Sequence, residues 1–419
     1  MNPKLNLSLV LHSHQPVGNF DFVIEDAFQT CYRPMIDAFA ARPEIKASLH
    51  FSGCLLEWIE AKHPDYFVAL RAGVERGQFD MIGGAMQEPI LTMLPERDRA
   101  GQLTRMRDYI EAQFGVRPAG MWLAERIWEQ SLVTTIANAG YSACCLDDSH
   151  FKNAGVADAD LKGGFIAEDQ GNALRVFPGS EKLRYLIPFH FVDEIIAYLR
   201  SQADVTGTKT LVYADDGEKF GVWPGTHQLC FVNGWLEEFL NALYDNRDWL
   251  NVVTLTEAAA FPSVGQAYLP DASYREMGEW ALPARRLAEL KSAQQSIESV
   301  PQAAAAFDRV KGQIRGGSWR NFRVRYPEAR RMYAKMLHVS EQVLTAETDP
   351  SVPKETVAAA RDDLYRGQCN CPYWHGVFGG LYLPHLRYGV QSALNRAQRR
   401  IEAARGGQRL IVEIGRAHV

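Results

Sequence analysis

The chain has 419 residues, of which 47% are hydrophobic and 11% aromatic, so it can bury a large core and is expected to form two domains. Its formal net charge of -5 lacks the concentrated positive charge of a nucleic-acid-binding surface, and we predict no nucleic-acid partner. No apolar run approaches the roughly 20 residues that span a bilayer, and the N-terminus opens without a signal-like apolar core. We therefore expect a cytoplasmic protein without a membrane partner, and the composition leaves its oligomeric state open.

Short apolar strands alternate with helices over the first part of the chain. The strand pattern is found at residues 5–11, 45–51, 77–84, 120–126, 141–146, 174–177, 185–188, 211–214 and 251–255. Helical periodicity separates them at residues 24–41, 55–76, 100–114, 131–139, 192–201 and 234–244. Because polar residues often follow the strands directly, the pattern favours a parallel α/β barrel of about seven strand-helix units over a doubly wound sheet.

The composition changes after Pro262. Turn-rich sequence leads into segments rich in Ala, Arg, Glu, Gln and Lys at helical spacing, at residues 286–297, 303–314, 323–346 and 355–368. We therefore predict a barrel domain over residues 1–270 and an α-helical domain over residues 271–405, whose loop at 367–376 reaches back to the barrel mouth. The tail, residues 406–419, is similar to the translation of a sequencing adapter and is expected to be non-native or truncated.

Acidic residues follow several of the predicted strands. They are Asp80, Glu125, Asp215, Asp216 and Glu218. A barrel brings its strand ends together at one face, so Glu125 and Asp216 are candidates for a pair of catalytic carboxylates. In a glycosidase that retains configuration, such a pair lies about 5–5.5 Å apart, and one member needs a raised pKa. The alternative is that these acids cap helices or pair with Arg126 and Lys219.

His12 and His14 lie at the end of the first strand, two residues apart, so their side chains point the same way. They can bind sugar hydroxyls, or they can begin a metal site with Asp80 or Asp148. The plainer interpretation is a pair of core histidines with satisfied hydrogen bonds. No further His or Cys at metal-ligand spacing occurs nearby, so we predict no metal and no other cofactor here.

The seven cysteines are odd in number and irregularly spaced, which predicts buried thiols rather than a disulfide framework. Cys369, Cys371 and His375 form a weaker metal candidate, because only three ligands lie together in the sequence.

Three tryptophans lie near these acids and thiols: Trp122, Trp223 and Trp374. Their flat faces can stack on pyranose rings, although any one of them can equally be part of an aromatic core. Three such rings beside three candidate segments favour a sugar-binding cleft.

Five stretches taken together resemble glycoside hydrolase family 57, the family of α-amylases and 4-α-glucanotransferases. They are residues 14–16 (HQP), 77–82 (GQFDMI), 122–127 (WLAERI), 215–223 (DDGEKFGVW) and 368–375 (QCNCPYWH). Their order adds to their specificity, and the resemblance extends from about residue 5 to about residue 388.

The resemblance implies a (β/α)7 barrel, incomplete relative to a full TIM barrel, followed by an α-helical bundle domain. It also implies a retaining mechanism on α-1,4-glucan or maltooligosaccharide, with Glu125 as the nucleophile and Asp216 as the acid/base. The sugar subsites would include His12, His14, Asp80, Trp122, Glu218, Trp223, Trp374 and His375. Two positions depart from the family: Asp80 replaces a glutamate, and Cys371 replaces an acid of the glucanotransferases, which affects donor-sugar binding.

Three hypotheses follow. The first is a retaining amylase or glucanotransferase. The second is a metal-dependent deacetylase or mannosidase on a related barrel, which would use His12, His14 and an acid. The third is a catalytically impaired glucan-binding protein, for which Cys371 is the main argument.

Overall fold

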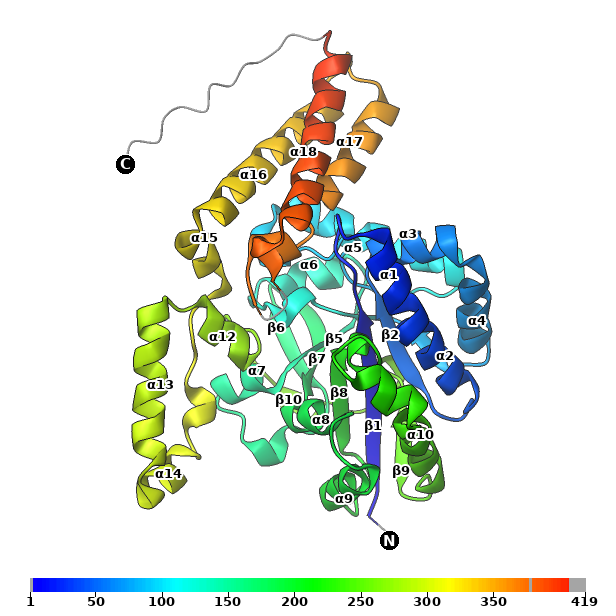
Figure 1. The fold of residues 1–419 in the computed structure, drawn as a ribbon, viewed down its shortest axis with the longest axis vertical. Helices are drawn as coiled ribbons and strands as arrows, with labels where there is room; N and C mark the ends of the chain where they lie inside the picture. Colours follow the sequence, from blue (N-terminus) through cyan, green and yellow to red (C-terminus); the bar gives the residue numbers. More distant parts are fainter. Residues whose placement is uncertain (1–2, 377–378, 407–419) are drawn as a thin grey trace.

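The computed structural model describes residues 3–376 and 379–406 and shows a barrel of parallel strands joined to a helical domain (Figure 1). The predicted fold class is thereby confirmed. The strands are β1 (Leu5–Ser13), β2 (Ala47–Phe51), β3 (Phe79–Met81), β4 (Gly120–Met121), β5 (Ala143–Asp147), β6 (Phe165–Asp169), β7 (Asn172–Gly179), β8 (Thr210–Asp216), β9 (Leu250–Val253) and β10 (Gly265–Gln266). The tail at residues 407–419, which we expected to be non-native, lies outside the described residues.

Seven parallel strands are neighbours around the barrel. β1 pairs with β2 and β8, β2 pairs with β3, and β5 pairs with β4 and β7, which in turn pairs with β8. A parallel bridge between Gly83 and Met121 connects the end of β3 to β4. All carboxyl ends of these strands consequently lie at the same face, as the alternation of strands and helices predicts.

The helices of the barrel domain occupy most of the predicted positions. They are α1 (Asp21–Ala27), α2 (Arg33–Ala40), α3 (Gly53–Lys62), α4 (Pro64–Glu75), α5 (Glu96–Phe114), α6 (Leu132–Asn138), α7 (Asp148–Asn153), α8 (Glu181–Leu186), α9 (Val192–Gln202), α10 (Trp235–Asp245) and α11 (Leu255–Ala259). The prediction of a strand at residues 185–188 is wrong. Ser180 caps α8 by accepting a hydrogen bond from the Leu183 amide at 3.2 Å, and Leu183 and Leu186 are buried at helical spacing.

The helices of the second domain pack in a core that they share with barrel residues, among them Ile90, Leu94 and Ile127. Its elements are α12 (Arg275–Ala281), α13 (Ala284–Glu298), α14 (Pro301–Phe307), α15 (Phe322–Arg325), α16 (Pro327–Glu347), α17 (Lys354–Arg366) and α18 (Pro384–Ala404). The helices α16, α17 and α18 lie side by side above the barrel, whereas α13 and α14 extend along its flank (Figure 1). The sequence pattern missed α12 and α18, and the boundary near Pro270 stays a prediction.

Two negative findings concern the described residues. None of their helices combines the length and apolar character needed to cross a membrane. Within the same residues the seven cysteines form no disulfide, as their number and spacing predict.

A buried polar network joins the two domains. The Asp98 carboxylate on α5 accepts hydrogen bonds from Ser340 on α16 and from the Gln368 amide, both at 2.6 Å. The amide of Gln102 on α5 donates to the Gln368 side-chain oxygen at 2.8 Å. Ser340, Gln102 and Gln368 are fully buried, so this network attaches the loop after α17 to the barrel in one position.

We predict that Gln368→Ala lowers the free energy of unfolding by about 2–3 kcal/mol, because it leaves Asp98 and Gln102 buried with fewer partners. Urea unfolding followed by circular dichroism measures the change. Gln391→Ala, which truncates an exposed glutamine on α18, is the matched control and should change stability little. Equal stabilities of the two variants would contradict a structural role for the network.

Candidate active site

The candidate site lies at the carboxyl ends of the barrel strands. His12 near the end of β1 is in register with His50 on β2 and with Asp216, the last residue of β8. Glu125 follows β4 in a short 3-10 helix, Ala124–Arg126. Glu125 and Asp216 are both half-buried, which leaves them partly accessible at the barrel mouth.

The backbone at Glu125 has an unusual conformation that its neighbours maintain. Glu125 and Arg126 both have φ of 51°, in the left-handed region that non-glycine residues rarely adopt. Ser273 donates a hydrogen bond to the Glu125 carbonyl at 2.6 Å, and the His150 ring bonds to the Arg126 carbonyl at 2.8 Å. Such conformations occur preferentially at functional sites, where the surrounding structure holds a side chain in place.

The two candidate catalytic carboxylates differ in their surroundings. Burial and the nearby Asp216 carboxylate raise the pKa of Glu125 to about 7. The Tyr274 hydroxyl donates to Glu125 Oε2 at 2.9 Å and opposes that rise, because it stabilises the ionised form. Burial and the adjacent Asp215 raise the pKa of Asp216, for which no side-chain donor is found among the described hydrogen bonds. The two carboxylates thus share a raised pKa but differ in that only Glu125 has a described side-chain donor, Tyr274.

Asp215 has a different environment although it is next to Asp216 in the sequence. It is buried and pairs with Lys219, with Arg184 at 3.3 Å and with Arg126 at 3.5 Å. Although burial opposes ionisation, these three cations lower the pKa of Asp215 to about 2. Because successive side chains of a strand point to opposite faces, Asp215 faces the cations and Asp216 the other side of β8.

Glu218 lies beside the pair and has donors of its own. Its Oε1 accepts hydrogen bonds from the Tyr32 hydroxyl at 2.5 Å and from the His14 amide at 2.8 Å. Burial and the negative charge of Asp216 raise the pKa of Glu218 to about 7. The carboxylates of Glu125, Asp216 and Glu218 thus raise one another's proton affinity, which favours a partly protonated group of acids near neutral pH.

His12 belongs to a buried cluster. Its Nδ1 lies 2.7 Å from Nδ1 of His50, and its ring stacks on Trp122 with centroids 4.5 Å apart. Burial lowers the pKa of His50 to about 3. Burial and the neighbouring His50 also lower the pKa of His12, so both rings are neutral. Burial also raises the pKa of Glu88, which faces both rings, to about 8. The Trp122 ring is itself buried, with the Arg126 guanidinium 4.9 Å from its centroid.

The remaining predicted subsite residues are placed differently. Trp223 is half-buried, stacks on Phe189 at 6.1 Å and lies over the Lys219 ammonium. Trp374 is mostly buried in the core of the helical domain, where its indole nitrogen donates to Asn370 at 2.8 Å. His375 bonds to the Gly379 carbonyl of its own loop at 2.9 Å.

Asp80 interacts with α11. Its carboxylate accepts hydrogen bonds from Ser48 at 2.9 Å and from the amide and hydroxyl of Thr256 at 3.1 and 3.0 Å. These contacts place Asp80 at the N-terminus of a short helix, which is a structural role.

Several residues of the site were not predicted. They are Tyr32, His50, Glu88, Arg184 and Tyr274. The position of His50 in a strand that pairs with β1 could have identified it. Tyr274 carries no such signal, because it follows the predicted domain boundary in a turn-rich segment.

A cavity of about 1110 Å³ lies next to the site, bounded by α7, α8 and α13. Tyr274 contributes to its lining, whereas Glu125 and Asp216 do not. The cavity therefore adjoins the carboxylate pair through the tyrosine that bonds to Glu125.

Two carboxylates with raised pKa values at the carboxyl ends of barrel strands are the kind of groups that a glycosidase uses. Residues 8–272 match glycosyl hydrolase family 57, and residues 317–401 match the alpha-amylase/4-alpha-glucanotransferase middle domain. The chain belongs to glycosyl hydrolase family 57, as the five sequence stretches indicate.

Similar proteins of known name support this assignment. The chain is 42% identical over 403 residues to alpha-amylase 1 of Dictyoglomus thermophilum, covering 96% of this chain and 57% of that protein. It is 42% identical over 399 residues to a 4-alpha-glucanotransferase of Thermococcus litoralis, covering 94% and 58%. The crystal structure of a 4-alpha-glucanotransferase from that organism superposes with a TM-score of 0.88 at 40% identity, covering 95% and 60%. The chain thus spans somewhat more than half the length of these relatives.

An alpha-amylase structure from Thermotoga maritima, at 13% identity and a TM-score of 0.66, shares the fold. The relatives do not favour the alternative of a metal-dependent deacetylase or mannosidase.

The contrast between Asp215 and Asp216 gives a test by stability. Asp215→Asn should lower the free energy of unfolding by about 3–5 kcal/mol at pH 7, because it removes the counter-charge of the buried Lys219 and Arg126, whereas Arg184 keeps Asp147 at 2.9 Å. Asp216→Asn should leave stability unchanged or raise it slightly, since it removes repulsion among acids. Thermal unfolding at pH 7 measures both.

The pH dependence adds a second readout for the same variant pair. The pKa of Asp215 is lowered on folding, so its contribution is present above the unfolded value of about 3.9 and is lost as the pH falls toward about 2. If Asp216→Asn were the more destabilising of the two, the assignment of a structural role to Asp215 would be wrong.

Proposed function

We propose that the chain cleaves α-1,4-glucan by a retaining mechanism, as an α-amylase or a 4-α-glucanotransferase. The observation that carries the proposal is the pair of Glu125 and Asp216 at the ends of two barrel strands, both with a raised pKa. Relatives named alpha-amylase and 4-alpha-glucanotransferase, each about 42% identical, support the same substrate class. A cytoplasmic location stays a prediction, and the oligomeric state stays open.

The first half-reaction transfers a glucosyl unit to the enzyme. The ionised Glu125 attacks the anomeric carbon while the protonated Asp216 gives its proton to the glycosidic oxygen, so the C–O bond breaks and the shortened glucan leaves. The Tyr274 hydroxyl keeps Glu125 in its ionised form and orients it. Burial and repulsion from Asp215 favour the protonated form of Asp216, which gives its proton to the leaving oxygen.

The second half-reaction releases the glucosyl unit. Asp216, now ionised, removes a proton from water or from a glucan 4-hydroxyl, which attacks the anomeric carbon and restores Glu125. Water gives hydrolysis and a glucan gives transfer, and the choice between them is open.

The sugar would be bound by residues around the pair. His14, Glu218 and Trp223 are half-buried at the strand ends, whereas His12 and Trp122 stack on each other and are buried. Trp374 lies on the loop anchored by Asn370 and is mostly buried. We assign Asp80 and His375 structural roles, since their hydrogen bonds go to α11 and to the loop that holds His375.

We predict that Glu125→Ala and Asp216→Ala each lower kcat on maltooligosaccharides by about 10²-fold to 10⁴-fold, because each removes one partner of the covalent mechanism. Product analysis by chromatography measures turnover, and longer as well as shorter sugars would indicate transfer. Asp193→Ala, an exposed acid on α9, is the control and should retain activity.

Rescue by azide separates the two roles. With an aryl α-glucoside, azide should give the β-glucosyl azide in Glu125→Ala through one inversion. It should give the α-glucosyl azide in Asp216→Ala through two. The same anomer from both variants would refute the assignment, and unchanged turnover in both would refute the enzyme hypothesis.

The hydrogen bond between Tyr274 and Glu125 predicts a pH effect. Tyr274→Phe removes a donor to the ionised form, so the pKa of Glu125 should rise by about one unit and move the acidic limb of kcat/KM to higher pH. The alkaline limb, which reports Asp216, should stay in place. Tyr268→Phe, which removes an exposed hydroxyl bonded to Glu168, is the control. An unshifted acidic limb in Tyr274→Phe would show that the bond does not stabilise the carboxylate.

A further inference from the structure

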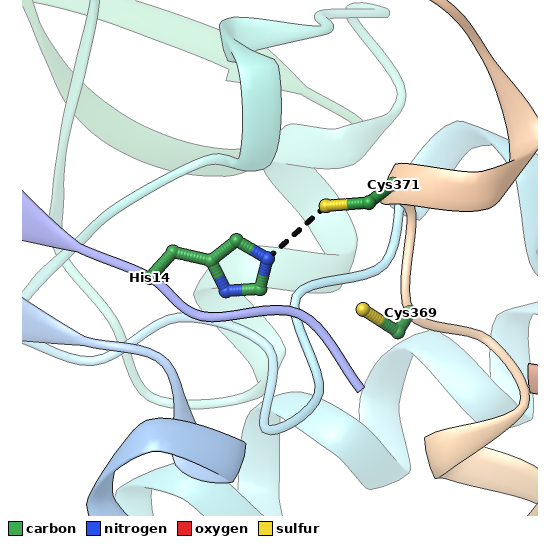
Figure 2. Close-up of side chains that lie close together, drawn as sticks. All are labelled: His14, Cys369 and Cys371. Carbon is green, nitrogen blue, oxygen red and sulfur yellow. Dashed lines mark hydrogen bonds between the residues drawn. The ribbon is translucent and has the colours of Figure 1, made fainter. Parts of the chain in front are cut away.

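Two thiols and an imidazole meet at the contact between the barrel and the helical domain. His14 comes from the segment after β1, and Cys369 and Cys371 come from the loop after α17 (Figure 2). Nε2 of His14 lies 3.3 Å from Sγ of Cys371, and all three potential ligand atoms lie within 4.8 Å of one another. Sequence spacing had paired the two cysteines with His375, which instead bonds to its own loop.

The separation between His14 and Cys371 is close to that in a tetrahedral zinc site, and the other two ligand separations are at most 4.8 Å. Zn–S bonds of about 2.3 Å and Zn–N bonds of about 2.05 Å place sulfur and nitrogen about 3.6 Å apart and two sulfurs about 3.8 Å apart. The separation of 3.3 Å between His14 and Cys371 differs from this by a few tenths of an ångström. Side-chain rotation alone can therefore bring the three atoms to bonding distance.

The imidazole is already oriented for binding. Nδ1 of His14 is hydrogen-bonded to Oγ of Ser52 at 2.8 Å, and the His14 backbone amide is bonded to Glu218. A metal-bound histidine typically uses its second ring nitrogen for such a bond, which fixes the tautomer and the ring orientation. Here the bond to Ser52 leaves Nε2 directed at the thiols.

The cysteine loop is anchored equally well. The amide and the side chain of Asn370, between the two cysteines, both donate to the Glu88 carbonyl, at 3.1 and 2.6 Å. The Asn370 side-chain oxygen accepts from the Trp374 indole. Cys369 is fully buried, whereas Cys371 and His14 are half-buried, so an ion has access from one side.

We propose that His14, Cys369 and Cys371 bind a thiophilic divalent cation such as Zn²⁺. Two thiolates and one imidazole form a donor set that Zn²⁺ prefers, and the fourth position is left for water. Binding replaces the two thiol protons, which are released to solvent. A second group, His12, His50 and Glu88, is a poorer candidate, because Nδ1 of His12 and Nδ1 of His50 are bonded to each other.

The bound ion would act on the site in two ways. It would cross-link the segment after β1 to the helical domain, which should stabilise the folded chain. It would also withdraw His14 from sugar binding and thus inhibit the cleavage of glucan. This inhibition rests on the proposed function, whereas the stabilisation of the folded chain requires no substrate.

The test uses the purified, reduced and metal-free chain. Zn²⁺ alone, titrated in a calorimeter, should bind with one ion per chain, and Co²⁺ alone should produce a sulfur-to-cobalt charge-transfer band. Cys371→Ser should abolish the band and weaken Zn²⁺ binding by about 100-fold or more, since loss of even an outer-shell partner costs 10-fold to 100-fold. Cys230→Ser, a buried thiol in the barrel core, should bind both ions as the wild type does.

Several outcomes would overturn the proposal. One is the absence of stoichiometric binding in the reduced chain, and another is equal binding by the wild type and Cys371→Ser. A loss of 2 Da on mild oxidation, without metal uptake before it, would show a disulfide between Cys369 and Cys371 instead. Circular dichroism of Cys371→Ser verifies its fold, and His14→Asn, which should also bind weakly, provides a second variant.

A separate measurement addresses inhibition. Zn²⁺ should lower the rate of maltooligosaccharide cleavage in the wild type and in Cys230→Ser, and much less in Cys371→Ser. An inactive wild type that still binds Zn²⁺ would refute the proposed function and leave the metal site intact. An active wild type that binds Zn²⁺ without inhibition would refute only the link between the two.

Discussion

The site depends on one buried ion cluster. Asp215 is surrounded by Lys219, Arg184 and Arg126, which belong to three different segments around β8. Each of these charges would be costly to bury alone, so the segments must assemble together or leave a charge unpaired. The same cluster fixes Arg126, whose neighbour in the chain is Glu125, and its central carboxylate raises the pKa of Asp216. A structural interaction on one face of β8 thereby sets the chemistry on the other.

The helical domain is part of this site rather than an addition to it. The Glu88 carbonyl of the barrel accepts both bonds from Asn370, and Gln368 two residues earlier is buried against Asp98. These contacts bring the loop that carries Cys371 and Trp374 to the strand ends. Because the loop is held by buried hydrogen bonds, its side chains are positioned before any ligand arrives, which lowers the entropic cost of binding.

Local patterns in the sequence predicted most strands and helices, because each apolar segment has the periodicity of the element it forms. The prediction of a strand at 185–188 is wrong because these residues follow and partly belong to a helix that Ser180 caps. This cap lies outside the segment itself. The carboxylates could be predicted as strand-end acids, yet only the resemblance distinguished Asp216 from Asp215. Its physical basis, the meeting of nearby Lys219 with Arg126 and Arg184 from distant segments, appears only in the folded chain. Tyr274 and the partner of the two thiols were beyond prediction for the same reason.

The replacement of an acid by Cys371 has opposite effects on the binding of a sugar and of a cation. The resemblance implies an acid at this position, and a neutral thiol is a much weaker hydrogen-bond acceptor than a carboxylate for a sugar hydroxyl. The same thiol lies 3.3 Å from His14, next to a second cysteine, where it supplies a soft ligand that an acid would not. His14 cannot donate to a sugar and ligate a cation through Nε2 at once. The cysteine at position 371 therefore weakens the binding of sugar at this site and strengthens the binding of a cation to His14. A small amount of cation can then suffice to displace a weakly held glucan.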